Sequence, residues 1–205
     1  SAFLATHNPE LIHLRRHLHA HPELGNREVV FGKHIFIERD DFCEEPPKGY
    51  FRLCPEREVR LKGAYYIKYV SCEKDADGNT VRVHCTYDPA TKGGNAPDGR
   101  KVKGTIHWVS GDNCTDAEVR LYDRLFLVEN PSDEEGVGDF SENLNPDSVE
   151  VISDCKIEKT LDVGEKGKTF QFMRQGYFCV DDDSTPEHPV FNRTVALKDS
   201  WAKKK

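Results

Sequence analysis

Apolar and polar residues alternate one by one along most of this chain. The alternation runs from Phe31 onward, and within DGRKVKGTIHWVSG at 98–111 the apolar Ile106 and Trp108 alternate with His107. Successive side chains of a β-strand point to opposite faces, so this pattern predicts strands with one face in a core and the other in solvent. The predicted strands cover 34–38, 57–61, 64–73, 79–88, 103–110, 120–128, 149–158, 168–181 and 191–199.

Turn signals separate these strands, and one helix precedes them. The sequence DADGN at 75–79 predicts a tight hairpin between two strands. Residues 9–21 have helical spacing, because Leu11, Leu14 and Leu18 share one face before Pro22 ends the helix. Many antiparallel strands with short turns and few helices predict an all-β fold of barrels or a sandwich.

Composition and charge narrow the function classes. The chain has 205 residues, with 37% hydrophobic and 32% charged residues, which is typical of a soluble globular protein of one large or two small domains. We expect no membrane association, since no apolar run approaches bilayer length. Seven cysteines without a CxxC spacing predict reduced thiols and a cytoplasmic protein.

The net charge of −7 argues against binding nucleic acid through bulk electrostatics. It is compatible with specific RNA binding through a local basic patch. Basic residues are concentrated in the first half of the chain, whereas 111–165 is rich in Asp and Glu.

Several segments, in one order from about Gly25 to the end, resemble the C-terminal anticodon-binding half of glutaminyl-tRNA synthetases. They are FGKHIFIERDDF (31–42), EVRLKGAYYIK (58–68), DGRKVKGTIHWVSG (98–111), EVRLYDRLF (118–126), GYFCVD (176–181) and PVFNRTVALKDSWAK (189–203). The resemblance implies two stacked six-stranded antiparallel β-barrels, similar to a ribosomal 5S-RNA-binding barrel. It implies an N-terminal helix and linker at 1–28, a proximal barrel at 29–112 plus 188–205, and a distal barrel at 113–187.

Arg60 and Lys62 are the first candidate binding residues. They are two apart on a predicted strand, so both side chains leave the face opposite Leu61. Two cations about 7 Å apart can grip adjacent phosphates or the edge of an unstacked base. The residues alone favour a solvated strand face paired with the nearby Glu56 and Glu58.

For this region the resemblance implies contacts of Arg52, Arg60 and Lys62 with the anticodon bases and their backbone. Lys62 stands where the family usually has arginine, so it keeps the charge but lacks the planar fork. Gly49 and Phe51 stand where the family often has polar or basic residues.

Gln171 lies between Phe170 and Phe172, so its amide is expected to face away from both rings. An amide that both donates and accepts suits the Watson–Crick edge of a splayed base. The residues alone, however, indicate an ordinary aromatic-rich core strand. The resemblance implies that Gln171 and Arg174 form the pocket for the middle anticodon base. It also implies a phosphate contact for Lys198.

The resemblance implies a non-catalytic module of a glutamine-tRNA ligase. Its partners would be the anticodon stem-loop of glutamine tRNA and the catalytic domain upstream, and we expect a monomer. That domain would bind ATP and Mg²⁺ for glutaminylation, so this chain should bind no cofactor or metal and should not aminoacylate alone.

Two alternatives from other classes remain open. LRRHLHAHPELG at 14–25 resembles the opening helix of metal-dependent amidohydrolases, and its histidines invite a zinc site. Helical residues two apart point about 200° from each other, however, so His17, His19 and His21 cannot converge on one ion within a helix. The other alternative is a free-standing 5S-type RNA-binding barrel.

Overall fold

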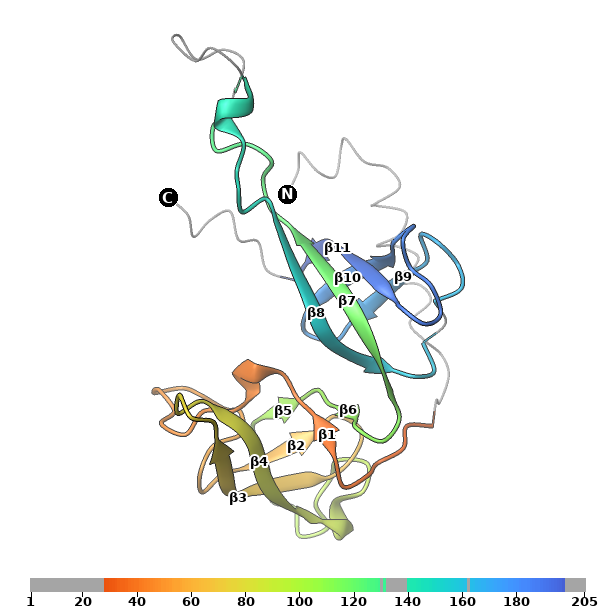
Figure 1. The fold of residues 1–205 in the computed structure, drawn as a ribbon. Helices are drawn as coiled ribbons and strands as arrows, with labels where there is room; N and C mark the ends of the chain where they lie inside the picture. Colours follow the sequence, from red (N-terminus) through yellow and green to blue (C-terminus); the bar gives the residue numbers. More distant parts are fainter. Residues whose placement is uncertain (1–27, 130, 132–139, 162, 198–205) are drawn as a thin grey trace. The chain divides into compact units, whose positions relative to one another are not determined.

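The computed structural model describes residues 28–129, 131, 140–161 and 163–197. The predicted helix at 9–21 and Lys198 lie outside these residues. The described part contains three short 3-10 helices, η1 (Arg39–Asp41), η2 (Pro89–Thr91) and η3 (Phe140–Asn143). Its strands (Figure 1) are β1 (Ile35–Phe36), β2 (Glu58–Leu61), β3 (Tyr66–Lys74), β4 (Thr80–Asp88), β5 (Thr105–Ile106), β6 (Val109–Ser110), β7 (Cys114–Tyr122), β8 (Val149–Glu158), β9 (Thr169–Phe172), β10 (Gly176–Val180) and β11 (Val190–Ala196).

The strands form three sheets, which confirms the all-β prediction. Their strand orders are β4-β3-β2-β5, β8-β7-β11-β10-β9 and β1-β6. The described residues form no closed six-stranded barrel, and the β2–β5 and β11–β7 pairs are parallel rather than antiparallel. No helix in this part of the chain is long and apolar enough to cross a membrane.

The segment 103–110, predicted as one strand, is divided between two sheets. Its first part, β5, pairs with β2, whereas β6 pairs with β1. At the break the Trp108 indole is buried and its Nε1 donates to the Lys62 carbonyl oxygen at 3.0 Å. This change of partner leaves each piece too short to continue a barrel wall.

The last strand also differs from the prediction. The resemblance implied that 188–205 completes the proximal barrel, but β11 lies between β10 and β7 in the five-stranded sheet. Phe191 explains this position, because its fully buried ring belongs to the core of that sheet. Beyond this strand the division into 29–112 plus 188–205 and 113–187 stays a prediction, since the described residues from Phe31 onward belong to one compact unit.

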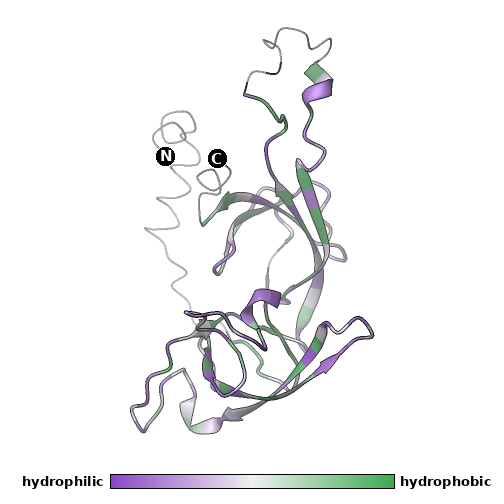
Figure 2. Ribbon diagram, turned by 90° about the vertical axis from the view of Figure 1, so that its left-hand side faces the viewer, coloured by the Kyte–Doolittle hydropathy of each residue, from purple (hydrophilic) through white to green (hydrophobic). Residues whose placement is uncertain are grey.

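The four-stranded sheet follows the predicted alternation closely. Val59 and Leu61 are buried in its core with Ile106 and Trp108, while Arg60 between them lies on the opposite face. Figure 2 shows the resulting alternation of apolar and polar segments along the strands. The DADGN turn joins β3 to β4 as predicted, with the amide of Asp75 donating to the Asn79 carbonyl oxygen at 2.9 Å.

Aromatic rings form the core of the five-stranded sheet. Phe172 stacks on Phe178 with ring centroids 4.6 Å apart, and its centroid lies 5.2 Å from that of Phe191. Phe170 packs into the same core, whereas Gln171 between the two rings is exposed. The predicted outward orientation of Gln171 is therefore confirmed.

A tight turn with Met173 and Arg174 at its centre joins β9 to β10. The amide of Gln175 donates to the Phe172 carbonyl oxygen at 3.0 Å, and Arg174 has a φ of 69°. This is the pattern of a type II turn, which favours glycine at the position that Arg174 occupies. A non-glycine residue in the left-handed region raises the conformational free energy by about 1–2 kcal/mol. The backbone at Arg174 is therefore strained.

Replacing Phe191 tests the aromatic core. Phe191→Ala removes a fully buried ring and should lower the free energy of unfolding by about 3–5 kcal/mol in urea titrations. The matched variant Phe140→Ala removes a ring that is 57% exposed and should cost far less. Similar losses for the two variants would contradict this assignment of the core.

Two substitutions of Arg174 separate backbone strain from side-chain contacts. Both Arg174→Gly and Arg174→Ala remove the guanidinium, but only glycine relieves a φ of 69°. The glycine variant should therefore be more stable than the alanine variant by about 1 kcal/mol in the same titrations. An alanine variant of equal or greater stability would show that the turn is not strained.

Candidate nucleic-acid interface

Arg60 projects from the polar face of β2 but is not open to solvent along its length. Its Nη2 donates to the Tyr66 hydroxyl at 2.9 Å, and its guanidinium carbon lies 5.3 Å from the centre of the Tyr66 ring. Its Nε is buried and makes no hydrogen bond within the described residues. Arg60 and Lys62, both predicted to leave the polar face of the strand, therefore differ in exposure: Arg60 is half-buried and Lys62 is exposed.

Arg100 occupies the same face and was missed by sequence reasoning. Its guanidinium lies 5.4 Å from the centre of the Tyr66 ring and forms ion pairs with Glu58 at 3.0 Å, Asp88 at 2.5 Å and Asp98 at 2.6 Å. Hydrogen bonds from Arg100 lower the pKa of Asp88, and they contribute to lowering that of Asp98. With three carboxylates around it, Arg100 adds no net positive charge for a phosphate.

Asp41 brings two of the predicted binding residues together. Its side chain is fully buried, and its Oδ1 lies 3.2 Å from Nη1 of Arg52 and 3.0 Å from Nη1 of Arg174. Nη1 of Arg174 also donates to Oδ2 of Asp41 at 3.0 Å. Burial raises the pKa of Asp41, while the two guanidinium groups oppose that shift. Both arginines remain partly open, with 39% of the Arg52 side chain and 33% of the Arg174 side chain exposed.

Backbone carbonyl groups complete the attachment of the two arginines. Arg52 donates to the Asp40 carbonyl oxygen at 3.0 Å, and Arg174 reaches that of Thr105 at 3.5 Å. Thr105 is also the partner of Arg60 in the parallel β2–β5 ladder. The side chain of Arg174 and the backbone of Arg60 therefore meet on β5.

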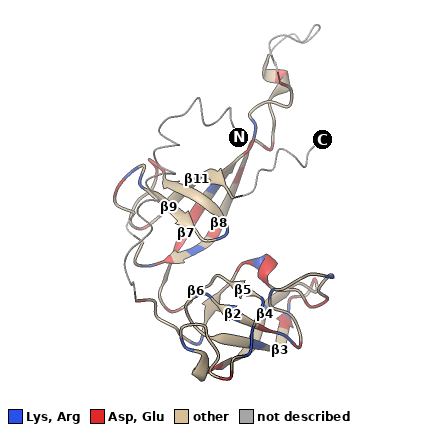
Figure 3. Cartoon of the chain, turned by 180° about the vertical axis from the view of Figure 1, so that it is seen from behind, with Lys and Arg blue, Asp and Glu red and all other residues tan. Residues whose placement is uncertain are grey.

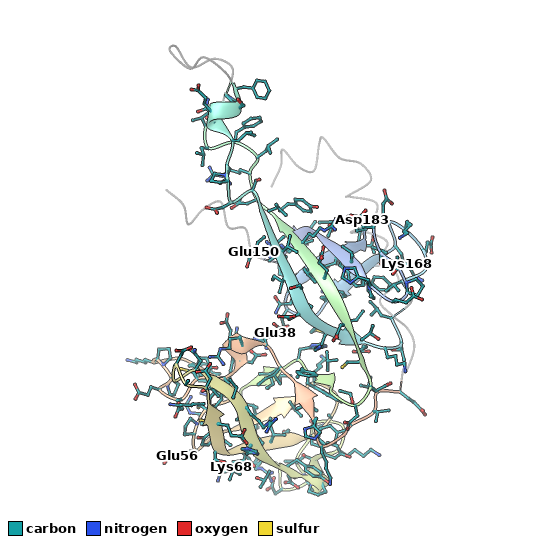
Figure 4. All side chains as sticks on the ribbon, viewed as in Figure 1. Glu38, Glu56, Lys68, Glu150, Lys168 and Asp183 are labelled. Carbon is teal, nitrogen blue, oxygen red and sulfur yellow. The ribbon has the colours of Figure 1, made fainter. Side chains whose placement is uncertain are left out.

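A second carboxylate, Glu38, precedes η1 (Figure 4). Burial raises its pKa, and the nearby Asp41 carboxylate raises it further. The side chain of Gln175, next to Arg174 in the β9–β10 turn, opposes this rise in the pKa of Glu38. Both residues of the turn therefore lie close to the carboxylates of the η1 region.

Gln171 lies on β9, which leads into this turn, opposite Tyr177 of β10. Its exposed amide makes no hydrogen bond to another described residue, and neither does the ammonium group of Lys62. Both side chains are therefore available to a ligand. Of the six predicted residues, the structure brings the side chains of Arg52 and Arg174 together at Asp41. Gln171 lies three residues before Arg174 on β9, Arg60 lies on β2 with Lys62 directly after that strand, and Lys198 lies outside the described residues.

Phe51 is a further exposed group in this region. Its ring is 50% exposed, and Nζ of Lys103 lies 5.1 Å from the ring centre. The segment is held close to β5, because a Cβ added at Gly104 would lie 1.8 Å from the Phe51 carbonyl oxygen. One indication of this exposed ring was present in the sequence, because Phe51 stands where the family often has a polar or basic residue.

Charge is mixed over both larger sheets, where basic segments lie beside acidic ones (Figure 3). This fits the net charge of −7 and means that the region offers individual cations rather than a broad positive surface. Within residues 28–129, 131, 140–161 and 163–197, no group of three or more His, Cys, Asp or Glu side chains is arranged to hold a metal ion. His17, His19 and His21 lie outside that part of the chain.

Comparison with known proteins identifies the family. Two families, both described as "tRNA synthetases class I (E and Q), anti-codon binding domain", match the chain, one over residues 4–88 and the other over residues 105–181. Similar relatives are the glutamine–tRNA ligases of Pseudomonas syringae pv. tomato, 53% identical over 184 residues, and Vibrio parahaemolyticus, 54% identical over 183 residues. Each alignment covers 89% of this chain and 32% of the relative, so the chain spans about a third of the length of the curated relatives it matches. The chain therefore belongs to the anticodon-binding domains of the class I tRNA synthetases for glutamate and glutamine, and is homologous to the C-terminal part of glutamine–tRNA ligases.

Proposed function

We propose that this chain recognises the anticodon stem-loop of glutamine tRNA. The observation that carries the proposal is the pair of partly exposed arginines, Arg52 and Arg174, that share the buried Asp41, with the exposed Gln171 three residues before Arg174 in the chain. The names of the relatives support glutamine tRNA as the substrate. RNA loops are read through unstacked bases, which need such hydrogen-bonding groups on a fixed frame.

The residues have different tasks in this proposal. The amide of Gln171 pairs with the Watson–Crick edge of the middle base, and the guanidinium of Arg174 clamps or stacks on the same base. Arg52 contacts the neighbouring part of the loop. Lys62 attracts backbone phosphate as a point charge, while the half-buried Arg60 supports the surface through Tyr66.

We also propose that the chain works as part of a cytoplasmic, monomeric glutamine-tRNA ligase. The ATP and Mg²⁺ for glutaminylation are held by the upstream catalytic domain, and this chain alone does not aminoacylate. A segment carrying η3 extends from the β7–β8 ribbon (Figure 1), with the exposed apolar side chains Leu125, Leu127, Phe140 and Leu144. Exposed apolar side chains of this kind suit a contact with that domain.

Removal of the base-reading groups should weaken RNA binding. In fluorescence titrations of a labelled glutamine anticodon hairpin, Gln171→Ala and Arg174→Ala should each cost roughly 1–3 kcal/mol, because each removes contacts to a base edge. The control Lys92→Ala changes an exposed lysine outside the site and should bind like the unchanged chain. Equal effects of all three variants would contradict the proposal, and so would tighter binding of a 5S-type RNA in competition.

Lys62→Ala should weaken hairpin binding by removing a positive charge, without changing the preference for the middle base. Losing one phosphate contact should reduce the slope of log K against log salt by about 0.7, with the same loss for hairpins of different middle base. Gln171→Ala should leave the slope unchanged but reduce the preference for the correct middle base. Loss of base preference in the Lys62 variant would show that Lys62 reads a base.

A further inference from the structure

Asp41 is the only buried charged residue in the described part of the chain. A buried carboxylate is costly unless it is paired, and pairs of this kind are often less stabilising than apolar residues of similar volume. Here Oδ1 makes ion pairs with both arginines but accepts no hydrogen bond within the described residues. Stability alone therefore gives little reason for a carboxylate at this position.

The effect of Asp41 on its partners is more informative. A free arginine side chain has about 2 kcal/mol of rotamer entropy, part of which is lost when it binds a ligand. Asp41 restricts Arg52 and Arg174 before any ligand arrives, while leaving a part of each side chain in solvent. Arg174 is restricted further by its strained backbone. The two guanidinium groups are thus prepared for binding.

The arrangement also links the arginines to each other. Both Nη1 atoms approach the same oxygen, Oδ1 of Asp41, at 3.2 and 3.0 Å. If a ligand moves one guanidinium away, Asp41 keeps only the other arginine as a partner, and the strength of that remaining ion pair changes. Arg52 and Arg174 lie far apart in the chain, and the described residues provide no other side chain that pairs with both.

We propose that Asp41 is a positioning residue for anticodon readout, holding Arg52 and Arg174 in their binding orientation and coupling their contributions. This rests on the proposed function. Asp41 itself does not touch RNA, because it is fully buried. It acts through the two arginines, so that the middle base and the neighbouring part of the loop are read together.

A double-mutant cycle tests the coupling without altering Asp41. Hairpin dissociation constants are measured for Arg52→Ala, Arg174→Ala and the double variant. Each single variant already disturbs the other arginine, so the double variant should lose at least about 5-fold less affinity than the product of the single losses. The matched cycle of Lys62→Ala with Arg174→Ala involves no shared carboxylate, and its losses should multiply. Multiplicative losses in both cycles would overturn the proposal.

Asp41→Asn tests the positioning role directly. Measured well below its Tm, this variant should bind the hairpin about 5-fold or more weakly, with reduced preference for the correct middle base, and its two arginines should contribute independently. Asp181→Asn is the control, since Asp181 is 14% exposed and pairs with Arg120 away from the site. A purely structural role of Asp41 would lower Tm and leave affinity and base preference unchanged. If Asp41→Asn does not fold, the arginine cycle decides.

The results separate this inference from the proposed function. A chain without preference for the glutamine anticodon hairpin overturns both. A chain that has this preference, loses it in Gln171→Ala and keeps it in Asp41→Asn overturns only the role of Asp41.

Discussion

A buried carboxylate with two guanidinium partners organises the candidate site. Asp41 lies in η1, Arg52 in the segment before β2, and Arg174 in the turn after β9, so a turn 133 residues further along the chain meets the region of η1 at one charge. A buried carboxylate is costly unless cations pair with it, and the same ion pairs restrict the two arginine side chains. The geometry of the site is therefore fixed by an electrostatic requirement of the interior rather than by the exposed surface.

The β9–β10 turn shows how the scaffold places a functional side chain at a cost. Glycine would fit the left-handed position without strain, yet Arg174 occupies it. The aromatic core immediately before the turn, with Phe172 stacked on Phe178, keeps β9 and β10 in register. The same alternation that buries Phe170 and Phe172 exposes Gln171. A rigid core thus supports an exposed amide and a strained arginine within four residues of each other.

Local pattern predicted several strands, because alternation depends only on neighbouring residues. It was wrong for 120–128, which overlaps β7 only at 120–122, and for 168–181, which is two strands, β9 and β10, joined by a turn. The range 149–158 was correct to the residue, and the outward position of Gln171 followed from the rings on either side. Partner choice was predicted poorly, since the position of β11 and the split between β5 and β6 depend on distant strands. Asp41 was also missed. In the acidic run ERDDF it looks like a solvated residue, and only tertiary contacts with Arg52 and Arg174 reveal its burial.

The acidic character of the chain fits readout of a few bases better than strong attraction to RNA. Arg100 is surrounded by three carboxylates and Arg120 by Glu118, Asp181 and Asp183, so several cations are neutralised within the fold. Each cation left available then contributes a large share of the positive charge at the interface. Nonspecific attraction to RNA backbone depends on the number of such charges, whereas discrimination depends on how firmly each donor is oriented. A surface with few, well-held donors therefore favours selectivity over affinity, and the remaining affinity must come from contacts elsewhere on the RNA.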